Sequence, residues 1–194
     1  TNYLIENGAN YLVVQGTTGE SATLSPQEKK EVLKCIVEVN KDRLPVVLGL
    51  GGNDTSALVD SFKNADLKGV SYILSVSPYY NKPTQEGLFL HYKAVAEAVD
   101  LPLVLYNIPG RTGVNMMPNT ISRLTVCPTI VAIKEGSGSV QQASEIIQLC
   151  GERLTVLAGD DALTLPMMAV GGKGVITVTA NLVPTAMAEL VNAF

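Results

Sequence analysis

The sequence predicts an α/β fold built around a parallel sheet. Short apolar runs rich in valine, isoleucine and leucine recur along the chain and are continuous rather than alternating, which is typical of strands buried on both faces. Windows with helical spacing separate these runs. The predicted strands are residues 11–15, 45–50, 70–76, 101–106, 129–134, 154–158 and 174–179. No linker or low-complexity tract interrupts the series, so we expect residues 1–194 to form a single domain.

The helices expected between the strands begin at recognisable capping residues. Ser25 is a predicted N-cap, Pro26 suits the first helical position, and Glu28 completes a capping box. Further helices are expected to open at Asp54, Ser139, Asp161 and Pro184.

Tandem β–α units leave two architectures open. A doubly wound sheet usually carries the order G-x-G-x-x-G after its first strand, and neither GTTGES (16–21) nor GLGGND (49–54) has that order. A (β/α)8 TIM barrel typically needs about 250 residues. We therefore expect a TIM barrel, present as a fragment that lacks the first strand and the C-terminal helical region. Its unpaired strand edges would favour aggregation.

The composition argues against several classes of function. A net charge of −4 with no basic stripe argues against nucleic acid as a partner. No apolar run approaches the ~20 residues of a membrane span, so no membrane partner is expected. Cys35, Cys127 and Cys150 are far apart, which indicates reduced thiols in a cytoplasmic protein. The single histidine, His91, fits a helical period and is expected to be structural, and no triad or zinc motif surrounds it.

Polar groups follow the predicted strands at the end where a barrel carries its active site. Each of them has an ordinary explanation when taken alone, and a lysine that ends a strand commonly reaches out to water. Their shared position on one rim favours a functional site instead. The candidates are Thr17, Thr18, Tyr80, Tyr106, Arg111, Lys134, Gly159 and Ile176.

This set of residues supports imine chemistry. A lysine is nucleophilic only when neutral, and burial at the mouth of a barrel lowers its pKa. Lys134 could then form a Schiff base with a 2-oxo acid and generate an enamine that attacks an aldehyde. Without an available histidine or an obvious carboxylate, a tyrosine is the natural proton carrier. Threonine hydroxyls and glycine N–H groups would hold the carboxylate of the 2-oxo acid, and Arg111 a second carboxylate.

Five motifs carry a resemblance to a known family. They are GTTGESATLS (16–25), SPYYNKPTQEGLFLHY (77–92), LYNIPGRTG (105–113), IKEGSG (133–138) and GDDALTLPMMAVGGKGVITVTAN (159–181). Along its whole length the chain resembles the 4-hydroxy-tetrahydrodipicolinate synthase (dihydrodipicolinate synthase) family. This family lies within the pyruvate-dependent class I aldolase superfamily, which includes N-acetylneuraminate lyase.

The resemblance implies a reaction and a role for each candidate. The reaction condenses pyruvate with L-aspartate 4-semialdehyde in lysine and diaminopimelate biosynthesis, with no metal or other cofactor, in a cytoplasmic homotetramer. Lys134 would form the Schiff base, and Tyr106, Thr17 and Tyr80 would relay protons, with Tyr80 entering the site of a neighbouring subunit. The implied substrate-binding residues are Thr18, Arg111, Gly159 and Ile176.

Two alternatives to this synthase remain, and one regulatory expectation follows. The protein could be another Schiff-base aldolase, of the N-acetylneuraminate lyase or 2-keto-3-deoxy acid type, or a barrel fragment without catalysis. The lyase usually has serine at the position of Thr17 and lacks Arg111, so the synthase is favoured. Lysine-inhibited relatives carry histidine and glutamate around an allosteric cleft. This chain has Pro26, Lys29 and Ala57 there, so weak or absent feedback by lysine is expected.

Overall fold

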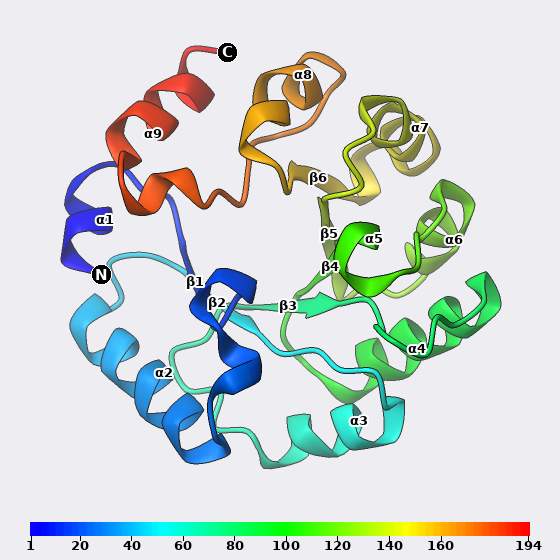
Figure 1. Ribbon diagram of the computed structural model, residues 1–194, viewed down its shortest axis with the longest axis horizontal. Helices are drawn as coiled ribbons and strands as arrows, with labels where there is room; N and C mark the ends of the chain where they lie inside the picture. The colour runs from blue at the N-terminus through cyan, green and yellow to red at the C-terminus, as the bar shows by residue number, and fades with distance from the viewer.

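A computed structural model describes residues 1–194. Six parallel strands lie side by side in chain order and curl into the centre of the molecule, with the longer helices around them (Figure 1). The strands are β1 (Leu12–Val14), β2 (Val46–Gly49), β3 (Tyr72–Val76), β4 (Leu103–Asn107), β5 (Ile130–Glu135) and β6 (Thr155–Ala158). The predicted α/β class and parallel sheet are therefore confirmed.

Helices connect successive strands across the outside of the sheet. The α-helices are α1 (Asn2–Glu6), α2 (Pro26–Asn40), α3 (Thr55–Asn64), α4 (Gln85–Ala98), α5 (Pro109–Thr112), α6 (Pro118–Leu124), α7 (Val140–Cys150), α8 (Thr164–Ala169) and α9 (Pro184–Asn192). Short 3₁₀ helices are η1 (Thr17–Gly19), η2 (Ser21–Thr23), η3 (Gly151–Arg153), η4 (Asp161–Leu163) and η5 (Thr179–Asn181). The terminal helices α1 and α9 lie beside each other, and the Tyr3 hydroxyl donates to the carbonyl of Leu182, just before α9, over 2.8 Å (Figure 1).

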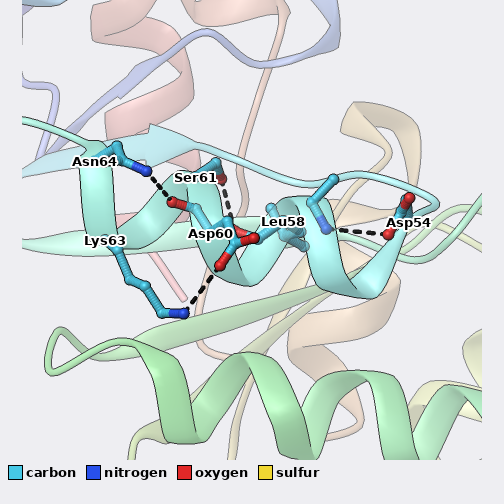
Figure 2. Close-up of polar contacts among 7 residues, drawn as sticks. Asp54, Leu58, Asp60, Ser61, Lys63 and Asn64 are labelled. Atoms are coloured by element: carbon cyan, nitrogen blue, oxygen red, sulfur yellow. Dashed lines mark hydrogen bonds and ion pairs between the residues drawn. The ribbon is translucent and has the colours of Figure 1, made fainter.

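The predicted helix starts are largely confirmed. The Ser25 side chain accepts from the Glu28 N–H, and the Glu28 carboxylate accepts from the Ser25 N–H, as a capping box requires. Figure 2 shows the same kind of contact at α3, where the Asp54 carboxylate accepts from the Ala57 N–H over 3.0 Å. Ser139 caps α7, and Pro184 is the first residue of α9.

The helix predicted to open at Asp161 is also confirmed, since the short helix η4 begins at that residue. Asp160 is the capping residue, because its carboxylate accepts from the Ala162 N–H. The Asp161 side chain points elsewhere and accepts from the N–H and hydroxyl of Thr179, over 2.9 and 2.7 Å. These contacts tie the turn after β6 to the segment before η5.

The seventh predicted strand, residues 174–179, does not form. Its only ladder contact is an isolated parallel bridge between Val175 and Ala158. The segment is hydrogen-bonded to β6 on one side, through Ile176 N–H and the Ala158 carbonyl. On its other side no strand pairs with the segment. The hydrogen bond there comes from a side chain, the Tyr11 hydroxyl, which donates to the Val175 carbonyl over 2.7 Å. The pairing with β6 ends at Ile176, because the chain turns into η5 from Thr179 on.

Side chains alternate between the two faces of the strands and build two cores. The larger core holds 28 buried residues between the sheet and the helices, including Ile73, Leu103 and Ile133. A smaller cluster lies on the inner, concave face of the sheet. Its members are Val47, Leu74, Val104, Tyr106, Ala132 and Ile176. Tyr106 and Lys134 are register partners, as are Asn107 and Glu135, so the two pairs face opposite sides of the sheet.

Ile133 tests the larger core. Its side chain is fully buried on β5, so the change Ile133→Ala is expected to lower the free energy of unfolding by about 2–5 kcal/mol. Urea denaturation of the full-length protein measures this loss. The change Val126→Ala is the control, since Val126 is 72% exposed and should move the midpoint very little. Equal effects of the two substitutions would contradict the proposed packing.

Candidate active site at the carboxyl ends of the strands

The predicted site residues come from four places at the carboxyl ends of the strands. Thr17 and Thr18 lie in η1, directly after β1, where the chain turns sharply with Gln15 at a φ of 61°. Tyr106 and Lys134 are the penultimate residues of β4 and β5. Arg111 lies in α5, the short helix that follows β4. Parallel strands all end on one edge of the sheet, so these groups converge.

Lys134 and Tyr106 are in direct contact. The Lys134 Nζ atom lies 4.2 Å from the centroid of the Tyr106 ring, and both residues are buried, at 9% and 5% exposure. They project from neighbouring strands onto the concave face. Val104 and Ala132 lie on the same face, two residues earlier on these strands. The lysine that ends the β5 strand therefore does not reach out to water as an ordinary surface lysine does.

Burial makes the Lys134 amine easier to deprotonate. Removal from water lowers the pKa of Lys134 from 10.5 to about 8, and the positive charge of Arg111 acts in the same direction. The Asp161 carboxylate opposes this shift. A lysine with a pKa of about 8 is partly neutral near physiological pH, which a nucleophilic amine requires.

Tyr106 stays protonated in the resting site. Burial raises the pKa of its phenol, while a hydrogen bond with the Thr17 side chain and the charge of Arg111 both act to lower it. The tyrosine thus has a protonated hydroxyl next to a partly neutral amine. Such a pair can supply a nucleophile and an acid at the same point, which is what the addition of an amine to a carbonyl needs.

A cavity of about 370 Å³ opens beside this pair. Three of the predicted site residues line it, namely Thr17, Tyr106 and Arg111. Its walls also include Gly49 and Gly51, and a Cβ atom added at Gly49 would lie 2.3 Å from the Gln15 carbonyl oxygen. The missing side chain at Gly49 lets the ends of β1 and β2 approach closely, and so fixes the turn that carries Thr17.

Five predicted site residues are not part of this cavity wall, namely Lys134, Thr18, Tyr80, Gly159 and Ile176. Thr18 is an exposed residue of η1, and Tyr80 is 88% exposed on the loop after β3. Gly159 and Ile176 border β6, where their N–H groups donate to the carbonyls of Glu135 and Ala158. Only the carbonyl groups of Gly159 and Ile176 are therefore free of main-chain hydrogen bonds and available to a ligand.

Asp161 influences the site, although the sequence suggested only that a helix opens at this residue. Its charge raises the pKa of Lys134, against the effect of burial. The signal in the sequence was the pair Asp160-Asp161, in which only one carboxylate is needed to cap the next helix. His91 is structural, as predicted, since its ring is 3% exposed and its Nδ1 atom lies 2.8 Å from the Thr55 hydroxyl.

Two further properties of the chain concern metals and membranes. No three histidine, cysteine, aspartate or glutamate side chains come together in a group that could hold a metal ion. None of the helices combines the length and the apolar character that crossing a membrane requires.

The curled parallel sheet with a buried lysine at its carboxyl edge defines an α/β barrel-type protein with a candidate amine nucleophile. Residues 1–194 match the family model of the dihydrodipicolinate synthetase family. The chain belongs to this family.

Relatives in this family match almost the whole chain. The 4-hydroxy-tetrahydrodipicolinate synthase of Geotalea uraniireducens is 56% identical over 192 residues, which cover 99% of this chain and 66% of the relative. The crystal structure of the chloride-inhibited dihydrodipicolinate synthase from Acinetobacter baumannii in complex with pyruvate is 45% identical, with a TM-score of 0.95. The dihydrodipicolinate synthase of Cyanidioschyzon merolae with lysine bound is 40% identical, with a TM-score of 0.93. These structures cover 99% of this chain each, and the chain covers 66% and 65% of their lengths.

Proposed function

We propose that this protein is a 4-hydroxy-tetrahydrodipicolinate synthase, which condenses pyruvate with L-aspartate 4-semialdehyde in lysine and diaminopimelate biosynthesis. The observation that carries the proposal is the buried Lys134 amine, 4.2 Å from the Tyr106 ring. The names of the relatives and the pyruvate complex of the Acinetobacter baumannii enzyme support the choice of substrate. We further infer that the strands belong to a (β/α)8 barrel in a single domain, and that the protein works in the cytoplasm.

The first half of the proposed reaction makes an enamine. The neutral Lys134 amine adds to the C2 carbonyl of pyruvate, and Tyr106 protonates the departing hydroxyl, so that water leaves and a protonated imine remains. The positive imine then draws electrons from the C3–H bond. The Tyr106 phenolate is a strong base because its pKa is raised, and it takes the C3 proton. The enamine forms and Tyr106 returns to its protonated state.

The second half joins the two substrates. The enamine carbon attacks the aldehyde of L-aspartate 4-semialdehyde, and the new alkoxide takes a proton from Tyr106. The amino group of the semialdehyde then displaces Lys134 from C2, which closes the ring and frees the lysine. The covalent imine takes the part that a cofactor plays in other carbanion chemistry, so the proposed reaction needs no metal and no bound cofactor.

The proposed substrate contacts follow from charge and position. Arg111 is exposed at the cavity wall and can bind the carboxylate of the semialdehyde by donating two parallel hydrogen bonds. Thr18 and the carbonyls of Gly159 and Ile176 are the proposed contacts of pyruvate. Thr17 would connect Tyr106 to the rest of a proton relay.

Tyr80 is the proposed end of that relay, acting on a neighbouring subunit of a homotetramer. Its side chain is 88% exposed, and its backbone has a φ of 73°, a conformation that is strained for any residue except glycine. A strained loop that presents an aromatic ring to the outside is consistent with a contact between subunits.

Borohydride reduction tests the proposal. The full-length protein is incubated with pyruvate and sodium borohydride, digested, and mapped by mass spectrometry. We expect one reduced pyruvate adduct on Lys134, and product formation when pyruvate and aspartate semialdehyde are supplied together. Turnover with sugar aldehydes instead would identify another aldolase of the same chemistry. The absence of any adduct would overturn the mechanism and favour a barrel without catalysis.

Lysine feedback is expected to be weak or absent. Ser21, Ala22, Lys29 and Tyr79 line the lower wall of the cavity, and none of them offers a carboxylate to a lysine ammonium. Lys29 belongs to α2, which begins with Pro26, and Ala57 lies in the first turn of α3. Initial rates of the full-length enzyme at millimolar L-lysine should fall by less than about twofold, well under the usual range of allosteric coupling. Strong inhibition at sub-millimolar lysine would contradict this expectation.

A further inference from the structure

Glu135 is a buried carboxylate that the proposed reaction does not use. It follows Lys134 directly in β5, has no exposed surface, and projects from the opposite face of the strand. A carboxylate that is removed from water is costly unless its oxygens are hydrogen-bonded. The hydrogen-bond donors around Glu135 therefore show how its carboxylate is stabilised.

Neutral donors surround the Glu135 carboxylate. The Ser137 N–H donates to Oε1 over 2.6 Å, and the side-chain amides of Asn107 and Gln142 donate to Oε2 over 3.0 and 3.1 Å. Neither a lysine nor an arginine forms an ion pair with Glu135. The charge is held by hydrogen bonds alone, which makes the geometry of each donor important.

The same network reaches the loop that carries Arg111. Asn107 donates to the Asn115 side chain over 2.8 Å and accepts from the Met116 N–H over 3.0 Å. Asn115 in turn donates to Gln142 over 2.7 Å. Residues 107 and 115–116 are the two ends of the loop that contains α5 and Arg111. The network thus connects the ends of β4 and β5, the start of α7 and both ends of this loop.

The register of the sheet connects this network to the reacting groups. Asn107 lies opposite Glu135, and one residue earlier on the same two strands Tyr106 lies opposite Lys134. A peptide unit is rigid, so a shift of the strand end at 135 also moves the side chain at 134. From this arrangement we infer that Glu135 is a positioning residue, which with Asn107 and Gln142 holds Lys134 against Tyr106 from behind the sheet. The inference rests on the proposed function, because it gives Lys134 and Tyr106 their roles.

The change Glu135→Gln tests the inference at constant size. The glutamine keeps one oxygen for the Ser137 N–H, but its amide then faces the donating amides of Asn107 and Gln142. The strand end should shift to relieve these donor–donor contacts. A displacement of about 1 Å can cost a hundredfold in rate, so we expect the imine trapping rate with pyruvate to fall by at least about tenfold. In the condensation of pyruvate with aspartate semialdehyde, the KM for pyruvate should change much less than kcat.

A second substitution reverses the pattern of donors. In the double variant Glu135→Gln with Asn107→Asp, the amide of residue 135 can donate to the carboxylate of residue 107. The side-chain amides of Asn115 and Gln142 can flip, so that their oxygen and nitrogen atoms exchange places. The main contacts between these four side chains then form again, with donors and acceptors exchanged. The double variant should therefore recover the trapping rate to within about threefold of the original protein. The single change Asn107→Asp places two carboxylates against each other and serves as the unrescued control.

The pH dependence of trapping separates positioning from other roles. A loosened strand end admits water to Lys134 and so raises the pKa of its amine. The midpoint of the curve of trapping rate against pH should therefore move to higher pH in the Glu135→Gln protein. The mere loss of a negative charge would move it to lower pH, and a purely structural role would lower the melting temperature while the rate and midpoint of the folded protein stay the same. Asp161 and Arg111, the charged groups that act on Lys134, are unchanged in every variant.

The outcomes distinguish this inference from the proposed function. Without an adduct in the original protein, the proposed function itself fails. With a normal adduct in both the original protein and the Glu135→Gln variant, at equal rate and midpoint, only the positioning role is refuted. Should the Glu135→Gln variant not fold, Gln142→Met removes one donor while leaving the carboxylate in place. It is expected to reduce the trapping rate in the same direction, and an unchanged rate would refute the positioning role.

Discussion

Replacing Lys134 with methionine is expected to abolish the pyruvate adduct and, at the same time, to stabilise the folded protein. The variant lacks the nucleophile, and the loss of such a group costs more than about a thousandfold in turnover. The methionine fills nearly the same volume over the Tyr106 ring and brings no charge into the buried site. Activity and stability should therefore move in opposite directions.

The gain in stability has a definite dependence on pH. The pKa of Lys134 is lowered from 10.5 to about 8 on folding, so below pH 8 the folded protein holds a buried ammonium at a cost of about 3 kcal/mol. Between pH 8 and 10.5 the unfolded chain binds more protons than the folded chain, so the original protein becomes more stable as the pH rises. The methionine variant should be more stable by about 2–3 kcal/mol at pH 7, and this advantage should shrink above pH 8.

Two measurements check this prediction. Borohydride trapping with pyruvate reports the nucleophile, and urea denaturation of the full-length protein at pH 7 and pH 9.5 reports the cost of burial. The matched control is Lys63→Met, because Lys63 lies on the surface of α3 and contacts Asp60 over 2.9 Å (Figure 2). The control should leave the adduct intact. An adduct that persists in the Lys134→Met protein would place the nucleophile elsewhere.

Much of the fold could be predicted because parallel strands have a simple sequence signature. Six of the seven predicted runs are strands, since continuous β-branched residues are buried on both faces. The seventh run, residues 174–179, has the same composition and forms only a bridge. Its sequence has the propensity of a strand, but its pairing with β6 ends at Ile176, and at Thr179, which donates to the Asp161 carboxylate, the chain already enters η5. That contact cannot be read from the segment itself.

The candidate site was predictable as a set of residues and less so as an arrangement. The position of Lys134 at the end of an apolar run indicated burial, and its contact with Tyr106 follows from the register of β4 and β5. The role of Asp161 was missed, because its contact with Thr179 joins segments 18 residues apart. The network around Glu135 was missed for a similar reason. Its partners Asn107, at the end of β4, and Gln142, in α7, have no distinctive sequence signal and come together only in the folded chain.

The change Tyr106→Phe separates the ring of this tyrosine from its hydroxyl. Phenylalanine keeps the aromatic face below the Lys134 amine, so the lysine stays buried and the pyruvate adduct should still accumulate, but more slowly, because the hydroxyl that protonates the departing water is lost. The hydroxyl and its hydrogen bond with Thr17 are lost, and with them the proton transfers at C3 and at the new alkoxide. Turnover with both substrates should fall by about 10²–10⁴-fold, the usual contribution of a positioned acid or base.

Measuring both the pyruvate adduct and the turnover of this variant distinguishes a packing role of Tyr106 from a role in proton transfer. If Tyr106 only packed against Lys134, phenylalanine would preserve both quantities; if it governed the nucleophile itself, both would fall. An adduct that still accumulates slowly, while turnover is lost, is expected only when the hydroxyl also carries protons after the imine has formed. Tyr72→Phe is the control, since Tyr72 lies on β3 with 37% of its surface exposed and should retain full turnover. Turnover of the Tyr106→Phe protein within about threefold of the original would assign the proton transfers to another group.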